Sequence, residues 1–382
     1  MKFKEFNLRK EHILALQDMY IENPTDIQSK VIPKMRKGKD ILAHAQTGTG
    51  KTLAFLIPIL ESIPDISSGI KSLIIVPTRE LSNQITDVLK YFQKYRSLSV
   101  VNASGGHNIT TQIQKLSSNT DIVVGTPGRV LDLLRNGNIN FKNIDSFVID
   151  EMDQILAFGF LEDVILLMNK TPRKKQVCMF SATVSQDVKK LSKQFMLNPI
   201  YLTAERGEVV LDNISQLIVQ TKDSRKLSSL IYSIEKINPF MCMIFCNSKK
   251  NAEKLYSDFI HHQYKNMELL HGEMSQNKRE NILKKFRELK VQYLITTDLS
   301  ARGMDIEGVS HVINYDIPRD VEYYIHRIGR TGRMNQIGYA ISFVTEKDIA
   351  NMKKIQKRIK KTIPVVYDTN NDKEREKMEY SF

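Results

Sequence analysis

The stretch 45–52 reads A-Q-T-G-T-G-K-T and lies between the apolar segments 40–44 and 53–57. This order predicts a strand, a glycine-rich turn and a helix. Glycines in such a turn let backbone N–H groups approach an anion, the lysine can reach outer phosphates and a threonine hydroxyl can bind magnesium. The helix also points its positive end at the phosphates. We therefore predict a nucleoside triphosphate site formed by Gln46, Thr47, Gly48, Thr49, Gly50, Lys51 and Thr52.

Ala45 stands where the general phosphate-loop pattern G-x-x-x-x-G-K-[ST] has a glycine, so the general match is incomplete. The alternative is a plain glycine turn between two buried elements. Gly-Lys-Thr at the start of a helix, directly after a strand, favours the phosphate site.

Composition limits the class of protein. The chain has 382 residues and a formal net charge of +13. The length suggests two or three domains. The charge favours a polyanionic partner, without separating nucleic acid from a membrane surface. No apolar run could span a bilayer and no signal-peptide core follows the first residues, so we expect a cytoplasmic protein. The three cysteines lack metal-ligand spacing, which indicates buried thiols.

Apolar strand-like segments alternate with helical patterns in both halves of the chain. This alternation predicts an α/β fold with two mostly parallel sheets, each covered by helices on both faces. In the first half we expect strands at 72–76, 99–101, 121–124, 146–149 and 176–180. In the second half we expect strands at 216–220, 241–245, 267–270, 293–296, 311–314 and 339–344.

The alternation lapses between 198 and 212, and we place the domain boundary there. The predicted organisation is a first domain at 1–203, a linker at 204–212, a second domain at 213–364 and a charged, disordered tail at 365–382. The segment 352–361 predicts a basic amphipathic helix. Two interpretations of this helix are open: its apolar face packs on the second domain, or its lysines contact nucleic acid directly.

Two carboxylates, Asp150 and Glu151, follow the strand predicted at 146–149. The carboxyl ends of parallel strands share one edge of a sheet with a phosphate loop, so we expect these side chains to meet Lys51 in one crevice. Asp150 would then hold magnesium together with Thr52, and Glu151 would orient and deprotonate a water. An acidic pair after a strand is common, and only its combination with the loop makes the prediction strong.

The segment 326–333 reads H-R-I-G-R-T-G-R. Its arginines suit a phosphoryl-transfer transition state, where arginine fingers accelerate hydrolysis roughly a thousandfold to a hundred-thousandfold. A basic loop or a plain phosphate patch is the alternative. Farther upstream, Gln28 carries an amide that can pair with the N6 and N7 edge of adenine. Taken alone, a glutamine at that place more often belongs to the start of a helix.

Together these motifs resemble the DEAD-box family of superfamily 2 RNA helicases over nearly the whole chain. The segment 24–28 resembles the adenine-reading Q motif, with Phe3 at the place of its upstream aromatic residue. The stretch 45–52 matches the family's own A-x-T-G-T-G-K-T loop, which accounts for Ala45. The segments 276–279, 297–305 and 326–333 resemble the Q-x-x-R element, motif V and motif VI.

The resemblance implies two RecA-like domains that use ATP and Mg²⁺. It implies a catalytic set made by Lys51, Asp150, Glu151, Arg330 and Arg333, with Asp305 on the ribose. RNA backbone contacts fall on Pro77, Arg79, Gly106, Thr126, Gly128, Arg129, Gln276, Arg279 and Thr297. Coupling of ATP state to strand separation falls on Asp153, Ser181, Thr183 and His326. Contacts to sugar and phosphate carry no base sequence, so this core should bind RNA nonspecifically and in a salt-sensitive way.

Two positions depart from the family pattern. Met152 replaces alanine in the eponymous tetrapeptide, which here reads D-E-M-D, and Tyr20-Ile21 replaces a glycine and an aromatic residue in the Q motif. The longer side chain of Met152 predicts altered coupling of Asp153 to its partners. The change at 20–21 predicts weaker stacking on adenine.

The resemblance implies RNA-stimulated ATP hydrolysis coupled to local unwinding of short RNA duplexes or to remodelling of RNA–protein complexes. By family analogy, the pathway would be ribosome assembly or RNA turnover, with ribosomal or RNA-processing proteins as partners. The open alternatives are a slowly hydrolysing, ATP-gated RNA clamp and a DNA helicase of the same superfamily. A small-molecule kinase would leave 326–333 and the second half unexplained.

Overall fold

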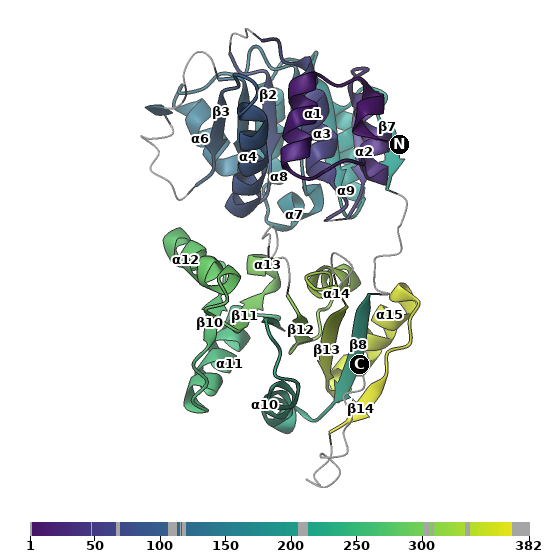
Figure 1. Cartoon of the computed structure of the whole chain (residues 1–382), viewed down its shortest axis with the longest axis vertical. Coiled ribbons are helices and arrows are strands. Elements are labelled where there is room, and N and C mark those ends of the chain that lie inside the picture. The colour runs from purple at the N-terminus through teal and green to yellow at the C-terminus, as the bar shows by residue number, and fades with distance from the viewer. Residues whose placement is uncertain are drawn as a thin grey trace. The chain divides into compact units, whose positions relative to one another are not determined.

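The computed structural model describes residues 2–46, 48–65, 69–105, 113–114, 116, 120–204, 213–301, 306, 309–332 and 337–368. The chain divides into two compact units, Met1–Arg206 and Gly207–Phe382. Each unit has one seven-stranded sheet with helices on both faces (Figure 1). The predicted α/β class with two parallel sheets is therefore confirmed.

The sheet of the first unit has the order β3-β4-β2-β5-β6-β1-β7, and its paired strands are parallel. Its strands are β1 (Ile41–His44), β2 (Ser72–Ile75), β3 (Val100–Ala103), β4 (Ile122–Gly125), β5 (Ser146–Ile149), β6 (Gln176–Ser181) and β7 (Ile200–Thr203). Its helices are α1 (Lys10–Asp18), α2 (Asp26–Met35), α3 (Lys51–Ser62), α4 (Arg79–Gln93), α6 (Pro127–Arg135), α7 (Met152–Ala157), α8 (Leu161–Asn169) and α9 (Gln186–Phe195), with a short 3-10 helix at Phe3–Phe6.

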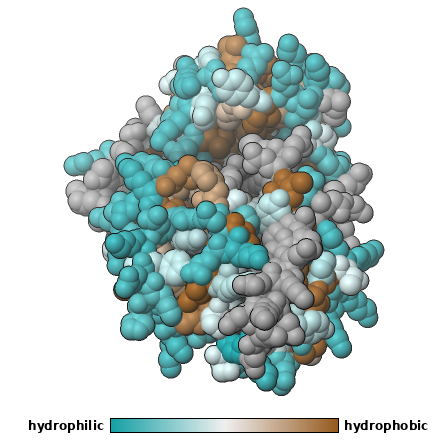
Figure 2. All heavy atoms as spheres, turned by 60° about the horizontal axis from the view of Figure 1, so that its bottom comes forward, coloured by the Kyte–Doolittle hydropathy of each residue, from teal (hydrophilic) through white to brown (hydrophobic). Residues whose placement is uncertain are grey.

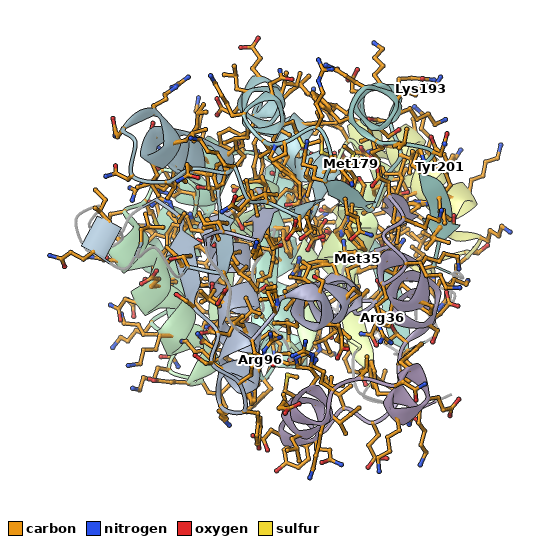
Figure 3. All side chains as sticks on the ribbon, turned by 90° about the horizontal axis from the view of Figure 1, so that it is seen from above. Met35, Arg36, Arg96, Met179, Lys193 and Tyr201 are labelled. Atoms are coloured by element: carbon orange, nitrogen blue, oxygen red, sulfur yellow. The ribbon has the colours of Figure 1, made fainter. Side chains whose placement is uncertain are left out.

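Two apolar cores lie on opposite faces of this sheet because successive strand residues point to opposite sides. In β1, Ile41 and Ala43 belong to the core under α1 to α4, whereas Leu42 belongs to the core under α6 to α9. Both faces are thus buried, as the continuous apolar strands require. Figure 3 shows Met35 and Met179 inside this unit and Lys193 at its periphery.

The second unit repeats this plan in the order β10-β11-β9-β12-β13-β8-β14, again with parallel pairs. Its strands are β8 (Ile214–Gln220), β9 (Cys242–Cys246), β10 (Met267–Leu270), β11 (Tyr293–Thr297), β12 (His311–Asn314), β13 (Gly338–Val344) and β14 (Val365–Tyr367). Its helices are α10 (Lys226–Ile237), α11 (Lys249–His261), α12 (Gln276–Arg287), α13 (Asp298–Ala301), α14 (Val321–Ile328) and α15 (Ile349–Ile359), with 3-10 turns at Asp223–Arg225 and Glu346–Asp348.

The two units divide between Arg206 and Gly207, inside the linker placed at 204–212. The strand β7 just before it, which pairs with β1, was not predicted, and one prediction about a segment end is wrong. The tail predicted to be disordered from 365 begins with β14, which pairs with β8. Asp368 then accepts hydrogen bonds from the hydroxyls of Ser229 (2.6 Å) and Thr221 (2.9 Å) and from the guanidinium of Arg225 (2.7 Å). The charged side chain of Asp368 therefore holds the start of this segment against the second unit.

The helix predicted at 352–361 packs on its own unit. Met352 and Ile355 of α15 are buried in the second unit's core, so the packing alternative is confirmed. The three cysteines are free and buried, as predicted. Among the described residues, no helix is long and apolar enough to cross a bilayer. The face drawn in Figure 2 is mostly hydrophilic, with hydrophobic residues in separate small patches.

Candidate active site

The carboxyl ends of three neighbouring strands in the first unit carry the predicted nucleotide motifs. Strands β5, β6 and β1 lie side by side, and they lead into Asp150-Glu151, the loop after Ser181 and the stretch 45–52, respectively. The Nζ of Lys51 donates to Oε1 of Glu151 at 2.5 Å and lies 3.9 Å from Oδ1 of Asp150. The two motifs therefore converge at one edge of the sheet, as predicted.

Burial sets the electrostatics of this cluster. Lys51, Asp150 and Glu151 are at most 5% exposed. Burial raises the pKa of Asp150 to about 7, because the opposing effect of Lys51 only partly offsets it. Burial alone would lower the pKa of Lys51, but the facing Glu151 and Asp150 carboxylates outweigh it and raise that pKa. Lys51 thus keeps its positive charge, and it faces carboxylates whose charged form is disfavoured by burial.

The glycines of the loop have the backbone that the motif requires. Gly48 and Gly50 have φ values of 82° and 92°, in the left-handed region. A Cβ at Gly50 would lie 2.4 Å from Nε2 of Gln28. The Thr49 hydroxyl donates to the carbonyl of Gln46 at 2.7 Å, which closes the turn ahead of α3. Thr47 lies outside the described residues.

Gln28 has a structural role at the start of α2. Its Oε1 accepts from the backbone N–H of Thr25 at 2.9 Å, in a capping box, and its Nε2 donates to the carbonyl of Gly50 at 2.9 Å. The alternative of a helix N-terminal role is confirmed. A carboxamide has two N–H donors and two acceptor lone pairs, so one of each remains for an adenine edge.

The two aromatic residues considered for the Q motif, Phe3 and Tyr20, differ sharply in exposure. Phe3 is 2% exposed and belongs to the apolar core, with its ring centroid 6.0 Å from that of Phe6. The adenine contact expected for Phe3 stays a prediction. Tyr20 is 95% exposed and has a φ of 58°, where the family pattern has glycine.

Glu151 is held in a strained conformation. Its φ of 51° and ψ of 50° place a non-glycine residue in the left-handed region at the start of α7. Its backbone N–H donates to Oδ1 of Asp150 at 2.9 Å, and Gln154 donates to its Oε2 at 3.1 Å. The sequence interpretation missed Gln154, although its position three residues after Glu151, within the first turn of a helix, places it on the same side.

Three of the four predicted coupling residues lie together. The Thr183 hydroxyl donates to Oδ2 of Asp153 at 3.4 Å, the Asp153 N–H donates to Oγ of Ser181 at 3.2 Å, and Ser181 donates to the carbonyl of Thr183 at 2.6 Å. His326 lies in α14 of the other unit. Met152 points away from this group, since it is fully buried in the core with Ile155.

The predicted RNA contacts of the first unit follow β2 and β4, on the same carboxyl edge. Pro77 and Arg79 follow β2, and a Cβ at Gly105 would lie 2.6 Å from a guanidinium nitrogen of Arg79. The arginine therefore lies directly over a glycine backbone. Thr126, Gly128 and Arg129 follow β4 at the start of α6. Gly106 lies outside the described residues.

The second unit has a pocket of about 490 Å³ at the carboxyl edge of its sheet. Thr297 lines it, as the RNA prediction requires, and its hydroxyl lies 2.9 Å from that of Ser300. The sequence interpretation missed the residues that line the pocket after β9 and β10, namely Asn247, Ser248, Lys249, His271, Gly272 and Glu273. Their position directly after predicted strands was the signal that could have found them. Arg279 lies in α12, and the side chain of Gln276 is not described.

The arginines of 326–333 have different roles. Arg327 is 1% exposed, and its Nε and Nη2 donate to the two carboxylate oxygens of Asp298 at 2.6 and 2.7 Å. It also donates to Asn314, Asn247 and the carbonyl of Asp316. Arg327 is thus a structural residue. Arg330 is buried at the end of α14, and Arg333 and Asp305 lie outside the described residues.

The residues present fit a magnesium–nucleotide ligand. Thr52 and Asp150 offer the hard oxygen ligands that Mg²⁺ prefers, and this ion takes its remaining ligands from phosphates and water. No cluster of three His, Cys, Asp or Glu side chains that could hold a metal occurs within the described part of the chain.

Comparisons with known proteins show the family to which the chain belongs. A DEAD/DEAH box helicase model matches residues 25–191, and a helicase conserved C-terminal domain model matches residues 224–335. The DEAD-box ATP-dependent RNA helicase CshA of Bacillus cereus (strain ATCC 10987 / NRS 248) is 35% identical over 94% of this chain and 68% of that protein. CshA of Bacillus subtilis (strain 168) is 36% identical over 94% of this chain and 72% of that protein.

Solved structures show the same relationship. S. cerevisiae Dbp5 bound to RNA and ADP BeF3 matches with a TM-score of 0.86 and 31% identity, over 98% of both chains. A DEAD box protein from the hyperthermophile Methanococcus jannaschii is 35% identical, with a TM-score of 0.56, over 96% of this chain and 99% of that one. Each unit accordingly has a RecA-like fold, and the chain belongs to the DEAD-box family of ATP-dependent RNA helicases.

Proposed function

We propose that this chain couples RNA-stimulated ATP hydrolysis to local unwinding of short RNA duplexes or to remodelling of RNA–protein complexes. As a family member the chain is an RNA-dependent ATPase. The buried contact of 2.5 Å between Lys51 and Glu151, beside Asp150, supports placing ATP hydrolysis at the carboxyl edge of the first sheet. It joins the phosphate loop to the carboxylates that hydrolysis needs.

In the proposed reaction, Lys51 leaves Glu151 and pairs with the outer phosphates of ATP. Glu151 then orients a water and accepts its proton, while Gln154 keeps the carboxylate in place. Thr52 and Asp150 would hold Mg²⁺, which neutralises phosphate charge when bound. Gln28 offers its remaining donor and acceptor to adenine.

Arg330 and Arg333 belong to the second unit, and we propose that they act as arginine fingers when both ligands are bound. Arg79, Arg129 and Arg279 have the chemistry for RNA phosphates, and Thr297 opens on a pocket at the corresponding edge. The coupling role proposed for Asp153, Ser181 and Thr183 rests on their mutual hydrogen bonds. We keep ribosome assembly or RNA turnover in the cytoplasm as the proposed setting.

The test is steady-state ATP hydrolysis with and without single-stranded RNA, with DNA of the same sequence as the control. We expect strong stimulation by RNA alone, and a loss of at least a hundredfold in Glu151→Gln, because the variant cannot accept a proton. Equal stimulation by DNA would instead favour a DNA helicase.

A duplex-unwinding assay then separates a helicase from an ATP-gated clamp. Release of the shorter strand with ATP supports unwinding. RNA-stimulated hydrolysis that is slow and releases no strand would support the clamp. RNA recovered by crosslinking in cells would test the proposed setting, and a recovery without ribosomal RNA precursors or decay intermediates would contradict it.

A further inference from the structure

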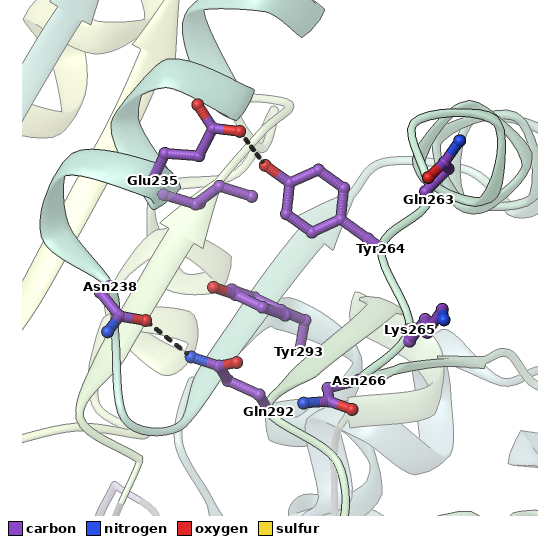
Figure 4. Close-up of a pocket in the computed structure, with 9 residues that line it drawn as sticks. Glu235, Asn238, Gln263, Tyr264, Lys265, Asn266, Gln292 and Tyr293 are labelled. Atoms are coloured by element: carbon purple, nitrogen blue, oxygen red, sulfur yellow. Dashed lines mark hydrogen bonds between the residues drawn. The ribbon is translucent and has the colours of Figure 1, made fainter.

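A second hollow lies at the opposite edge of the second unit's sheet. Its volume is about 410 Å³, and residues just before β10 and β11 and at the end of α10 line it (Figure 4). Tyr293 starts β11 on this side and Thr297 ends it at the carboxyl edge. At about 3.3 Å per residue these positions are roughly 13 Å apart along the strand. The hollow is therefore separate from the pocket that contains Thr297.

Hydrogen bonds fix the walls of this hollow. The Tyr264 hydroxyl donates to Oε1 of Glu235 at 2.7 Å. Gln292 donates from Nε2 to Oδ1 of Asn238 at 3.3 Å and to the carbonyl of Pro239 at 2.7 Å. The rings of Tyr264 and Tyr293 stand at 89° with centroids 6.4 Å apart. The shape is thus held by side chains that already have partners.

One hydroxyl group on the wall of the hollow is left for a ligand. Tyr293 is 6% exposed, and its hydroxyl makes no hydrogen bond to another described residue. Burial raises the pKa of Tyr293 to about 12, so the hydroxyl keeps its proton and can donate. Figure 4 shows it directed toward the side formed by Asn238 and Glu235. The hydroxyl is not among the buried atoms that lack a partner, so solvent in the hollow can reach it, and a bound acceptor would take the place of water.

The lining favours a flat ligand with both donors and acceptors. Glu235 has an oxygen, Oε2, beyond the one that Tyr264 occupies, and carboxylates accept from exocyclic amino groups of bases. Lys265 and Asn266 line the hollow on the side across from Glu235 (Figure 4). Phe240, two residues beyond Asn238, does not line the hollow but is 69% exposed, and an exposed ring can stack on a base. These are the features of single-stranded nucleic-acid contacts, in a chain with a net charge of +13.

We propose that this hollow binds one unpaired RNA base that carries an exocyclic amino group, with Glu235 accepting from the amino group and Tyr293 donating to a ring nitrogen or carbonyl. Uracil is disfavoured because its O4 carbonyl would face the carboxylate. Lys265 supplies a cation for the adjoining phosphate. The inference rests on the proposed RNA function and adds a base preference that a backbone-directed core does not provide.

The first test compares binding of oligocytidine and oligouridine of equal length to the full chain, by fluorescence anisotropy at one fixed low salt concentration. We expect tighter binding of oligocytidine by roughly fivefold to tenfold. Tyr293→Phe, which removes only the hydroxyl, should reduce this preference. Glu235→Gln should raise oligouridine affinity, because an amide can donate to O4. Tyr256→Phe, on α11 and outside the hollow, is the matched control and should leave the preference unchanged.

The second test is ultraviolet crosslinking of oligocytidine followed by mass spectrometry, which should find adducts at Tyr264 or Tyr293. Equal affinities for both oligonucleotides, no change in Tyr293→Phe, or adducts only at the carboxyl-edge loops would each overturn the inference. The inference would also be overturned if these variants released a bound peptide and left RNA binding unchanged. RNA-stimulated ATPase activity with oligouridine should survive in Tyr293→Phe. Its absence in the unmodified chain would refute the proposed function instead.

Discussion

Each unit pairs a buried cation with carboxylate oxygens at the carboxyl edge of a parallel sheet, but the two clusters are built differently. In the first unit, Lys51 makes a single short contact to Glu151, which has strained backbone, and Asp150 has a raised pKa. In the second unit, the guanidinium of Arg327 pairs with both oxygens of Asp298 and fills its other sites with Asn247, Asn314 and a carbonyl.

The difference separates a ligand site from a scaffold. A lysine ammonium is a point charge that can exchange one partner for another, whereas the planar guanidinium is fixed by its bidentate geometry. The first cluster therefore has capacity left for phosphates, and the second holds β9, β12, α13 and α14 together. The burial of Lys51 and Arg327 and their charge alone would not have separated the two clusters.

Loss of the arginine scaffold should have the largest effect. Arg327→Met should destabilise the second unit by about 3–5 kcal/mol, because the buried Asn314, the carbonyl of Asp316 and the partly exposed carboxylate of Asp298 would all lose their donor. Arg358→Met is the matched control, since the ion pair of Arg358 with Glu322 lies at the surface and should contribute less than about 1 kcal/mol. Urea unfolding of the full chain measures both. Equal effects would mean that the comparison of the clusters is wrong.

The next largest effect on stability is expected at Met152, which lies between Glu151 and Asp153. Met152→Ala restores the family tetrapeptide but leaves a cavity in a fully buried position, at a cost of about 2–4 kcal/mol. Since Met152 faces the core, the ratio of ATPase rates with and without RNA should stay unchanged. Met152→Leu is the control for volume. A changed ratio in a folded Met152→Ala protein would restore the sequence-based expectation that Met152 alters coupling.

A pH effect should appear in the second unit. Burial lowers the pKa of His311, stacked on Tyr339, to about 4, below its unfolded value of about 6.5. The neutral ring is favoured by folding, so its contribution is complete above about pH 6.5 and is lost as the pH falls toward 4. We expect a loss on the order of 1–2 kcal/mol over that range. The stability of His311→Gln should depend less on pH, whereas exposed His261→Gln should behave like the original chain.

The smallest effect tests whether backbone strain by itself marks a functional site. Tyr20 shares the left-handed conformation of Glu151 but is exposed and outside the cluster. Tyr20→Gly should stabilise the first unit by about 0.5 kcal/mol, since relief of strain slightly exceeds the added freedom of the unfolded chain. Tyr20→Ala keeps the strain and serves as the comparison. Thermal unfolding would contradict this view if alanine were the more stable variant.

The sequence predicted most strands, because apolar runs are local signals. It also predicted that Lys51 meets Glu151, because the motifs follow parallel strands whose carboxyl ends share one edge of the sheet. It missed β14 because a three-residue edge strand with exposed Val365 and Tyr367 has no apolar pattern. It missed the structural role of Arg327 because only packing shows which of several arginines is enclosed. Burial of Phe3 was equally hidden, since an aromatic residue suits a core and a base platform alike.

The pairing of β1 has a consequence for synthesis of the chain. Its partners are β6 and β7, whose residues Cys178 and Ile200 align with Ile41. The strand that ends in the phosphate loop therefore leaves the ribosome long before either neighbour exists. Parallel pairing across such a separation is slow, and the unpaired apolar strand is exposed to aggregation meanwhile. The nucleotide cradle is thus the last part of the first unit to mature, so nascent chains ending before β7 should bind no ATP.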